Sequence, residues 1–298
     1  MRSRFRGSYV ALPTPFRDGH LDLEALEAHA DDLVSRGTDG LVACGTTGEA
    51  ATLSNDERDE VLRAALRGAS GRVPVIAGIG TNATHSSIEL AIAAERCGAY
   101  GLLAVTPYYN RPNAEGLKQH FLKLAHATEL PLVLYNVPSR TGVDLTPELV
   151  AEIAEEDARV VAIKEASGEL ERATRIAELT DVDILCGEDR LTMAYMTAGA
   201  MGTIGVVGNL VPEKVAELVR AAHPGSNRLR AETLDEELAP LVRALFLDTN
   251  PIPLKAALAL LGRCQDELRL PLVPLAAGLR PRLEQAVLEL TRSSEAVA

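Results

Sequence analysis

The sequence predicts an α/β protein, a (β/α)8 TIM barrel followed by a small C-terminal helical domain. Eight short apolar runs rich in Val, Ile and Leu recur along the chain, and helix-length stretches separate most of them. Eight parallel strands are the number that closes such a barrel. After the eighth run the chain shows only the apolar spacings of three and four that are typical of helices.

The eight runs are apolar almost throughout, as expected for parallel strands that are covered on both faces. In chain order they are Tyr9–Leu12, Leu41–Cys44, Val73–Ala77, Leu102–Val105, Leu132–Tyr135, Val160–Ile163, Asp183–Cys186 and Thr203–Val207. The clearest predicted helices are Leu23–Arg36, Asp56–Ser70, Ser86–Cys97, Pro147–Ala154 and Pro212–Ala222. A doubly wound open sheet is the alternative, but it would place a glycine-rich G-x-G-x-x-G turn after the first strand, where this chain reads Leu-Pro-Thr-Pro-Phe.

We expect the barrel to occupy residues 1–225 and the helical domain residues 226–298. The turn-forming cluster His223-Pro-Gly-Ser-Asn227 marks the boundary. Prolines in the segments Asn250–Pro253 and Leu270–Pro274 divide the second part into about three helices, because proline starts or ends helices and rarely lies inside them.

Composition excludes several classes of protein. The chain has 30 basic against 42 acidic residues, a formal charge of −12, so we expect no nucleic-acid partner. No apolar run approaches the roughly 18 residues that span a membrane, so no membrane association is expected. The N-terminus lacks the apolar segment of a secretory signal, which favours a cytoplasmic protein.

The active site of a (β/α)8 barrel lies at the carboxyl ends of its strands. The residues that follow the apolar runs are therefore the candidates. They include Gly45-Thr-Thr-Gly-Glu49, Thr106-Pro-Tyr-Tyr-Asn110, Tyr135-Asn-Val-Pro-Ser-Arg-Thr-Gly142, Lys164-Glu165 and Gly187-Glu-Asp189.

Lys164 ends the sixth predicted strand, and strand alternation places its side chain inside the barrel or at its mouth. Loss of hydration there favours the uncharged amine, which can condense with a ketone to form a Schiff base. The protonated imine would then withdraw electrons from a carbanion, so no metal or cofactor is expected. The alternative is a structural lysine that is ion-paired with Glu165 or with a carboxylate on a neighbouring strand.

Polar residues beside Lys164 complete a predicted site. Tyr135, on the adjacent strand, could act as general acid and base, although a buried tyrosine is more often part of the core. Thr46 and Thr47, in a glycine-flanked turn, suit a small carboxylate, and Arg140 could bind a second carboxylate through two hydrogen bonds. An ordinary turn and a solvated arginine are the simpler interpretations. Taken together, these residues predict a lyase that joins a 2-oxo acid to a second acidic substrate, or splits such a product.

These motifs, in this order, closely resemble the dihydrodipicolinate synthase / N-acetylneuraminate lyase family, and within it the dihydrodipicolinate synthases. The resemblance extends from Gly7 to the segments Asn250–Lys255 and Leu270–Pro274, which is nearly the whole chain. It implies a homotetrameric (β/α)8 enzyme without a cofactor. The implied reaction condenses pyruvate with L-aspartate 4-semialdehyde to give 4-hydroxy-tetrahydrodipicolinate, in lysine and diaminopimelate biosynthesis.

The same resemblance assigns roles to individual residues. It makes Lys164 the Schiff-base lysine and Tyr135 the proton donor and acceptor, linked through Thr47 to Tyr109, which in the family reaches in from a neighbouring subunit. Carboxylate binding falls to Thr46 and Thr47 for pyruvate and to Arg140 for the semialdehyde. Backbone atoms of Gly187 and Ile204 are expected to line the pocket.

The resemblance also predicts a degenerate regulatory site formed by Asn55, Asn82, Ser86 and Tyr108. Family members that lysine inhibits carry a histidine and a glutamate where this chain has Asn55 and Ser86. Without the glutamate, the lysine ammonium loses its carboxylate partner. We therefore expect weak feedback inhibition by lysine, or none.

Two alternatives stay open from the sequence. A sister lyase, such as N-acetylneuraminate lyase or a 2-keto-3-deoxy sugar acid aldolase, would share Lys164 and Tyr135 but take another second substrate. Arg140 within Ser-Arg-Thr-Gly argues against it, because neuraminate lyases have no arginine there. A catalytically silent barrel that binds a small acid is the more remote alternative, and it would not need the whole set of reactive residues.

Overall fold

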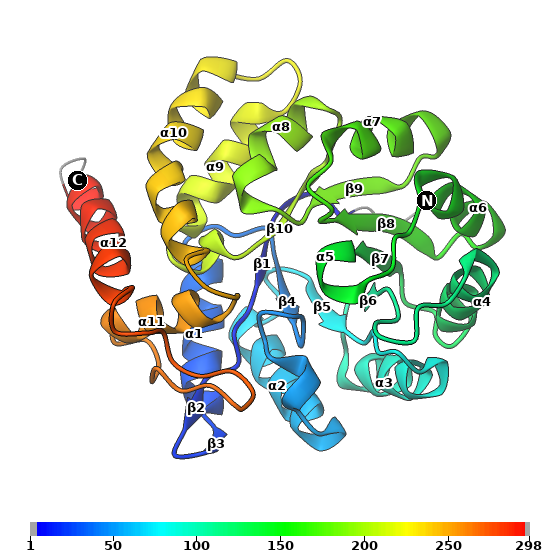
Figure 1. The fold of residues 1–298 in the computed structure, drawn as a ribbon, viewed down its shortest axis with the longest axis horizontal. Helices are drawn as coiled ribbons and strands as arrows, with labels where there is room; N and C mark the ends of the chain where they lie inside the picture. The colour runs from blue at the N-terminus through cyan, green and yellow to red at the C-terminus, as the bar shows by residue number, and fades with distance from the viewer. Residues whose placement is uncertain (1–4, 296–298) are drawn as a thin grey trace.

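The computed structural model describes residues 5–295 of the chain. Its eight long strands are all parallel and close into a barrel in the order β1-β10-β9-β8-β7-β6-β5-β4. Figure 1 shows the strands at the centre, with helices arranged around them. The predicted (β/α)8 fold is confirmed. The ends of the two predicted domains, residues 1–4 and 296–298, lie outside the described residues.

Each barrel strand coincides, within a few residues, with one of the eight apolar runs. The strands are β1 (Gly7–Ala11), β4 (Gly40–Ala43), β5 (Val75–Gly78), β6 (Gly101–Val105), β7 (Leu132–Asn136), β8 (Val160–Glu165), β9 (Asp183–Cys186) and β10 (Gly202–Gly205). Most of their residues are buried on both faces, because helices cover the outside and side chains fill the inside. The sequence analysis missed the small antiparallel pair β2 (Phe16–Arg17) and β3 (His20–Leu21), whose strands are too short for a periodic signal.

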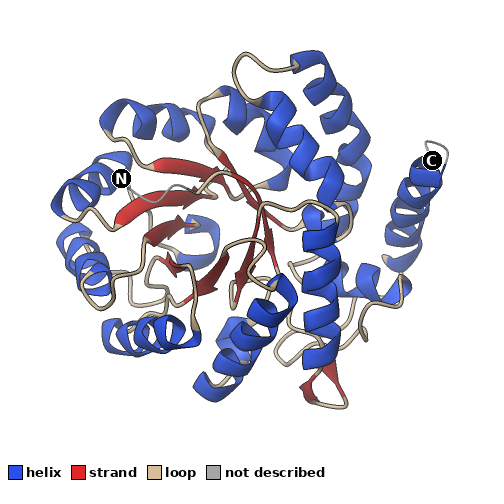
Figure 2. Ribbon diagram, turned by 180° about the vertical axis from the view of Figure 1, so that it is seen from behind, coloured by secondary structure: helices blue, strands red, loops and turns tan. Residues whose placement is uncertain are grey.

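Helices surround the barrel, as Figure 2 shows from the other side. They are α1 (Leu23–Ser35), α2 (Asn55–Ala69), α3 (Thr84–Cys97), α4 (Ala114–Ala125), α5 (Pro138–Thr141), α6 (Pro147–Glu156), α7 (Leu170–Leu179), α8 (Thr192–Thr197) and α9 (Pro212–Ala222). Several of these helices begin at a residue whose side chain accepts a hydrogen bond from the first turn. At α2, for example, Ser54 and Glu57 form a capping box. All five helices that the periodicity predicted are present.

The C-terminal part contains α10 (Arg228–Leu245), α11 (Ile252–Leu260) and α12 (Arg280–Glu295), which lie to one side of the barrel in both views (Figures 1 and 2). The predicted division into three helices is confirmed. The expectation that proline stays outside helices is wrong at Pro240, which lies inside α10. Pro240 and Glu236, one turn earlier, are both exposed, so water can hydrate the carbonyl that the proline leaves without a donor.

The boundary between the two predicted domains stays a prediction. One apolar cluster joins the end of the barrel to the C-terminal helices; it includes Val207, Leu218, Leu234, Leu241 and Leu254. Another fills the barrel interior, around Tyr9, Val42, Leu103 and Leu185. None of the described helices is both long enough and apolar enough to cross a bilayer.

Candidate active site

A cavity of about 330 Å³ opens at the carboxyl ends of the strands, where the barrel fold predicts an active site. Its walls come from the loops after β4, β6 and β7 and from two C-terminal segments. They include Thr46, Tyr108, Tyr135, Arg140, Asn250 and Leu272. Three predicted substrate groups, Thr46, Tyr135 and Arg140, therefore share one cavity wall.

Lys164 lies against Tyr135, which lines the cavity, although Lys164 itself is not among the lining residues. The two residues are direct partners in the β7–β8 register, and both are almost completely buried. The Lys164 Nζ lies 4.4 Å from the centroid of the Tyr135 ring. Because an aromatic face attracts a cation but accepts no proton from it, this contact holds the amine in place and leaves its nitrogen available for chemistry.

Gly187 provides the space that the Lys164 side chain occupies. A Cβ atom at position 187 would lie 3.0 Å from Lys164 Cε and 2.7 Å from the Ala166 Cβ. The Gly187 N–H is already used, since it donates to the Glu165 carbonyl at 2.8 Å. Ile204, on β10, is buried among the side chains that fill the barrel interior. Neither residue is among those that line the cavity wall.

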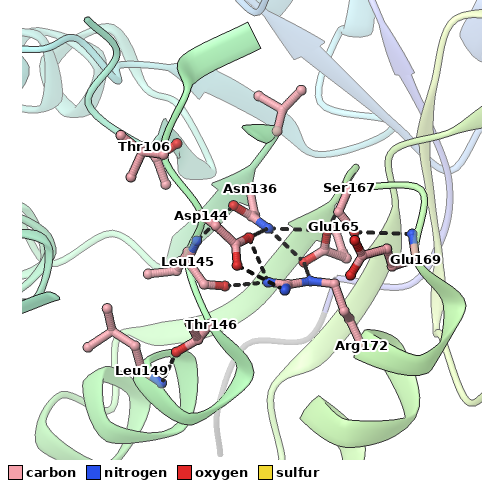
Figure 3. Close-up of polar contacts among 12 residues, drawn as sticks. Thr106, Asn136, Asp144, Leu145, Thr146, Leu149, Glu165, Ser167, Glu169 and Arg172 are labelled. Atoms are coloured by element: carbon pink, nitrogen blue, oxygen red, sulfur yellow. Dashed lines mark hydrogen bonds and ion pairs between the residues drawn. The ribbon is translucent and has the colours of Figure 1, made fainter. Parts of the chain in front are cut away.

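The alternative of an ion pair between Lys164 and Glu165 does not agree with the structure. Successive residues of β8 face opposite sides, so the Glu165 carboxylate points away from the barrel interior. It accepts hydrogen bonds from Asn136 Nδ2 and from the Ser167 N–H, and it lies 3.5 Å from Arg172 Nε (Figure 3). Within the described part of the chain, Lys164 forms no ion pair at all.

The polar network around Glu165 also fixes the loop that presents Arg140. Arg172 donates to the Leu145 carbonyl at 2.7 Å and pairs with Asp144, and Asn136 Oδ1 accepts the Leu145 N–H (Figure 3). The Arg140 side chain is exposed at the mouth, and its Nη2 donates to the Asn250 carbonyl at 3.3 Å. The guanidinium is thus positioned over the cavity, with donors still open to an anion.

The turn that carries Thr46 and Thr47 is held by local geometry. Glu49 has a φ of 52°, in the left-handed region, and the Thr14 hydroxyl donates to the Gly48 carbonyl at 2.7 Å. A Cβ atom at position 48 would approach the Leu12 carbonyl to 3.2 Å, so a larger side chain fits there only if its neighbours shift slightly. Thr46 is half-buried and lines the cavity, while Thr47 is buried just behind it.

A buried ion pair connects this turn to the C-terminal helices, and the sequence analysis did not find it. Lys255 Nζ donates to Glu49 Oε1 at 2.7 Å, and the Arg269 N–H donates to Glu49 Oε2 at 3.0 Å. Both side chains of the pair are inaccessible to solvent. Burial lowers the pKa of Lys255, whereas the Glu49 carboxylate raises it. This ion pair holds the turn that contains Thr46 and Thr47 against the C-terminal helices.

Asp189 is the buried carboxylate whose electrostatic field reaches Lys164. Its carboxylate accepts the backbone N–H groups of Val206 and Val207 at 2.9 to 3.3 Å. Burial raises the pKa of Asp189, and those two amides and the Lys164 amine act in the opposite direction. The sequence placed Asp189 at the end of a strand but gave it no role.

Tyr109 and the predicted regulatory residues are not gathered around the cavity. Tyr109 is 90% exposed, with a φ of 73°, and does not line the cavity. Of the four regulatory positions, only Tyr108 belongs to the wall. Asn55 is exposed at the start of α2, Asn82 lies just before α3, and Ser86 lies in the first turn of α3.

No cluster of three or more metal-ligating His, Cys, Asp or Glu side chains occurs in the part of the chain that the structure describes. The reactive groups at the site include the amine of Lys164, the phenol of Tyr135, and the hydroxyl and guanidinium groups around them.

The family model that matches this chain is that of the dihydrodipicolinate synthetase family, over residues 4–290. A 4-hydroxy-tetrahydrodipicolinate synthase from Pelobacter propionicus is 48% identical over 281 residues, which cover 94% of this chain and 96% of that protein.

Solved structures agree over a similar length. The dihydrodipicolinate synthase from Aquifex aeolicus has a TM-score of 0.94 and 40% identity, covering 96% of this chain and 98% of that one. A chloride-inhibited synthase from Acinetobacter baumannii in complex with pyruvate has a TM-score of 0.92 and 42% identity, covering 95% and 98%. With its (β/α)8 barrel, its buried lysine and tyrosine pair and these similarities, the chain belongs to the dihydrodipicolinate synthetase family.

Proposed function

We propose that this protein condenses pyruvate with L-aspartate 4-semialdehyde to give 4-hydroxy-tetrahydrodipicolinate, through a Schiff base on Lys164. The observation that carries the proposal is the placement of the Lys164 amine against the Tyr135 ring, without an ion pair to occupy it. The relatives that bear this activity in their names are similar over nearly the full chain. The reaction serves lysine and diaminopimelate biosynthesis and takes place in the cytoplasm.

The first half of the reaction activates pyruvate. The Lys164 amine attacks the keto carbon, and water leaves from the carbinolamine to give the protonated imine. Tyr135 donates and accepts the protons of these steps, in exchange with Thr47 and Tyr109. Thr46 and Thr47 hold the pyruvate carboxylate, while backbone atoms of Gly187 and Ile204 border the substrate.

The second half forms the new carbon–carbon bond. Loss of a methyl proton converts the imine to an enamine, whose carbon attacks the aldehyde carbon of the semialdehyde. Arg140 holds the carboxylate of that second substrate. The substrate's own amine then displaces the Lys164 nitrogen by transimination, which closes the ring and regenerates the free lysine. The protonated imine nitrogen accepts an electron pair when the methyl proton leaves, and the enamine nitrogen returns it when the new bond forms, so the chemistry requires no metal or cofactor.

A coupled assay tests the proposal. Purified protein is mixed with pyruvate and L-aspartate 4-semialdehyde, and the product is followed with dihydrodipicolinate reductase. In parallel, borohydride is added with pyruvate alone and the intact mass is measured. Turnover together with a covalent adduct supports the proposal. An adduct without turnover would indicate that the second substrate is that of a sister aldolase. The absence of an adduct would favour a catalytically silent barrel that binds a small acid.

We further propose a homotetramer in which Tyr109 reaches the active site of a neighbouring subunit. Its 90% exposure in the isolated chain supports this role, because the whole ring is accessible for contact with a neighbouring subunit. Mixing inactive Lys164→Ala and Tyr109→Phe proteins tests it. Partial recovery of activity after the subunits exchange is expected, and sedimentation gives the oligomeric state.

The substitution of Ser86 for a glutamate supports our proposal that lysine inhibits this protein weakly or not at all. Ser86 cannot provide the carboxylate that would neutralise the ammonium of a bound lysine. A titration of the coupled assay with L-lysine checks this. Half-maximal inhibition at submillimolar lysine would contradict it.

A further inference from the structure

We propose that Asn250 is a positioning residue that orients the Thr47 hydroxyl for proton transfer. This inference rests on the proposed function and deepens it. Asn250 lines the cavity, yet it belongs to the turn between α10 and α11 and not to one of the strand-end loops. The segment between α10 and α11 thus contributes Asn250 to the wall of the active-site cavity.

Two hydrogen bonds place Asn250 between the groups proposed to bind the two substrates. Its side-chain Nδ2 donates to Thr47 Oγ1 at 3.0 Å, and its backbone carbonyl accepts from Arg140 Nη2 at 3.3 Å. The first bond depends on the side chain and the second does not. A substitution at position 250 therefore removes the contact with Thr47 and leaves the acceptor for Arg140.

The direction of the first bond has a chemical consequence. A hydroxyl has one proton to donate and two lone pairs that accept. Because the Asn250 amide donates to Thr47 Oγ1, it occupies one lone pair and turns the hydroxyl proton toward other acceptors. A threonine held this way is prepared to pass a proton to Tyr135 or Tyr109 during carbinolamine formation and dehydration.

The rest of the Asn250 amide contributes little to stability. Its Oδ1 is buried and has no hydrogen-bond partner within the described residues. An unsatisfied buried acceptor destabilises the folded state, which offsets the gain from the bond to Thr47. The amide is therefore better explained by what it does to Thr47 than by a contribution to folding.

Two variants separate the hydrogen bond that the Asn250 side chain donates from the shape of that side chain. Asn250→Ala removes the side chain, whereas Asn250→Leu keeps its branched shape but cannot donate a hydrogen bond. In both we expect kcat to fall roughly 10- to 10²-fold, as for a misplaced catalytic group. The KM for the semialdehyde and the Tm should change little. A Leu variant with the kcat of the wild type would overturn the proposal.

A double variant tests whether Asn250 acts through Thr47. In a Thr47→Val background the hydroxyl is absent, so Asn250→Ala should cause no additional loss of kcat. Independent, multiplicative losses would contradict the proposal. As a matched control, Asn227→Ala removes another asparagine of the C-terminal helices, one that caps α10 and is exposed, and it should leave kcat unchanged.

The rate of pyruvate capture distinguishes this inference from the proposed function. Each variant is mixed with pyruvate alone and quenched with borohydride at successive times, so the second substrate plays no part. Slower adduct formation in Asn250→Ala than in wild type is expected. If wild type forms the adduct faster than Asn250→Ala but does not turn over with the semialdehyde, the proposed second substrate fails and the inference stands. If all variants capture pyruvate at one rate, the inference fails and the proposed function stands.

Discussion

Two hollows at opposite ends of the barrel differ in what their walls offer. The cavity at the carboxyl ends of the strands measures about 330 Å³, while a hollow at the amino ends, beside β5 and the end of α2, measures about 450 Å³. Among the described residues that line the larger hollow, Arg72 is the one cation. Its guanidinium already donates to the Gly68 and Ala69 carbonyls and to Ser35, and it pairs with Asp31.

The difference shows that volume alone does not make a site. At the amino ends Arg72 already donates to the protein's own carbonyls and pairs with a carboxylate, which stabilises the fold and leaves its charge less available to a ligand. At the carboxyl ends, the Lys164 amine is held by an aromatic ring, and the Arg140 guanidinium keeps donors open to the cavity. Groups that the fold positions without satisfying them are the ones available for chemistry.

The largest expected effect follows from removing the amine. Lys164→Ala should abolish both turnover and the pyruvate adduct, because no other residue at the mouth can form the imine. Intact mass after borohydride treatment measures it. An adduct that persists in this variant would show that another amine is the reactive one. The contrast between a reactive carboxyl end and a structural amino end of the barrel would then no longer depend on Lys164.

The next effect concerns proton transfer. Tyr135→Phe keeps the ring that contacts Lys164 and removes only the hydroxyl, so the fold should be unchanged. If Tyr135 is the acid and base, kcat should fall roughly 10²- to 10⁴-fold. Steady-state kinetics in the coupled assay measures the change. A loss of less than about tenfold would exclude that role and leave Tyr135 as a packing partner of the lysine.

A smaller and more selective effect is expected at the rim. Arg140→Ala removes charge-assisted hydrogen bonds to the second carboxylate, which are worth about 1.5–3 kcal/mol, so kcat/KM for the semialdehyde should fall roughly 10- to 10²-fold. The pyruvate adduct should still form at nearly the wild-type rate. Equal losses in kcat/KM for the semialdehyde and in the rate of pyruvate adduct formation would mean that Arg140 maintains the shape of the cavity mouth and does not recognise one substrate.

The sequence predicted the parts of this site that depend on local pattern. Strand alternation placed Lys164 inside the barrel, and adjacent strands brought it to Tyr135 in direct register. It could not reveal the contacts made by the C-terminal helices. Asn250 meets Thr47, and Lys255 meets Glu49, across 203 and 206 residues of chain, and no periodicity encodes such distances.

The smallest effect is expected for Arg72, in the hollow at the amino ends of the strands. Arg72→Ala removes an ion pair that is largely exposed and the hydrogen bonds to the end of α2. Exposed pairs and helix-end contacts are each worth up to about 1 kcal/mol, so Tm should fall by roughly 2–4 °C. Thermal unfolding measures this, and kcat should equal that of the wild type. A large loss of kcat with an unchanged Tm would contradict this comparison, since it would place a functional group in the hollow where the Arg72 guanidinium is already paired by the fold.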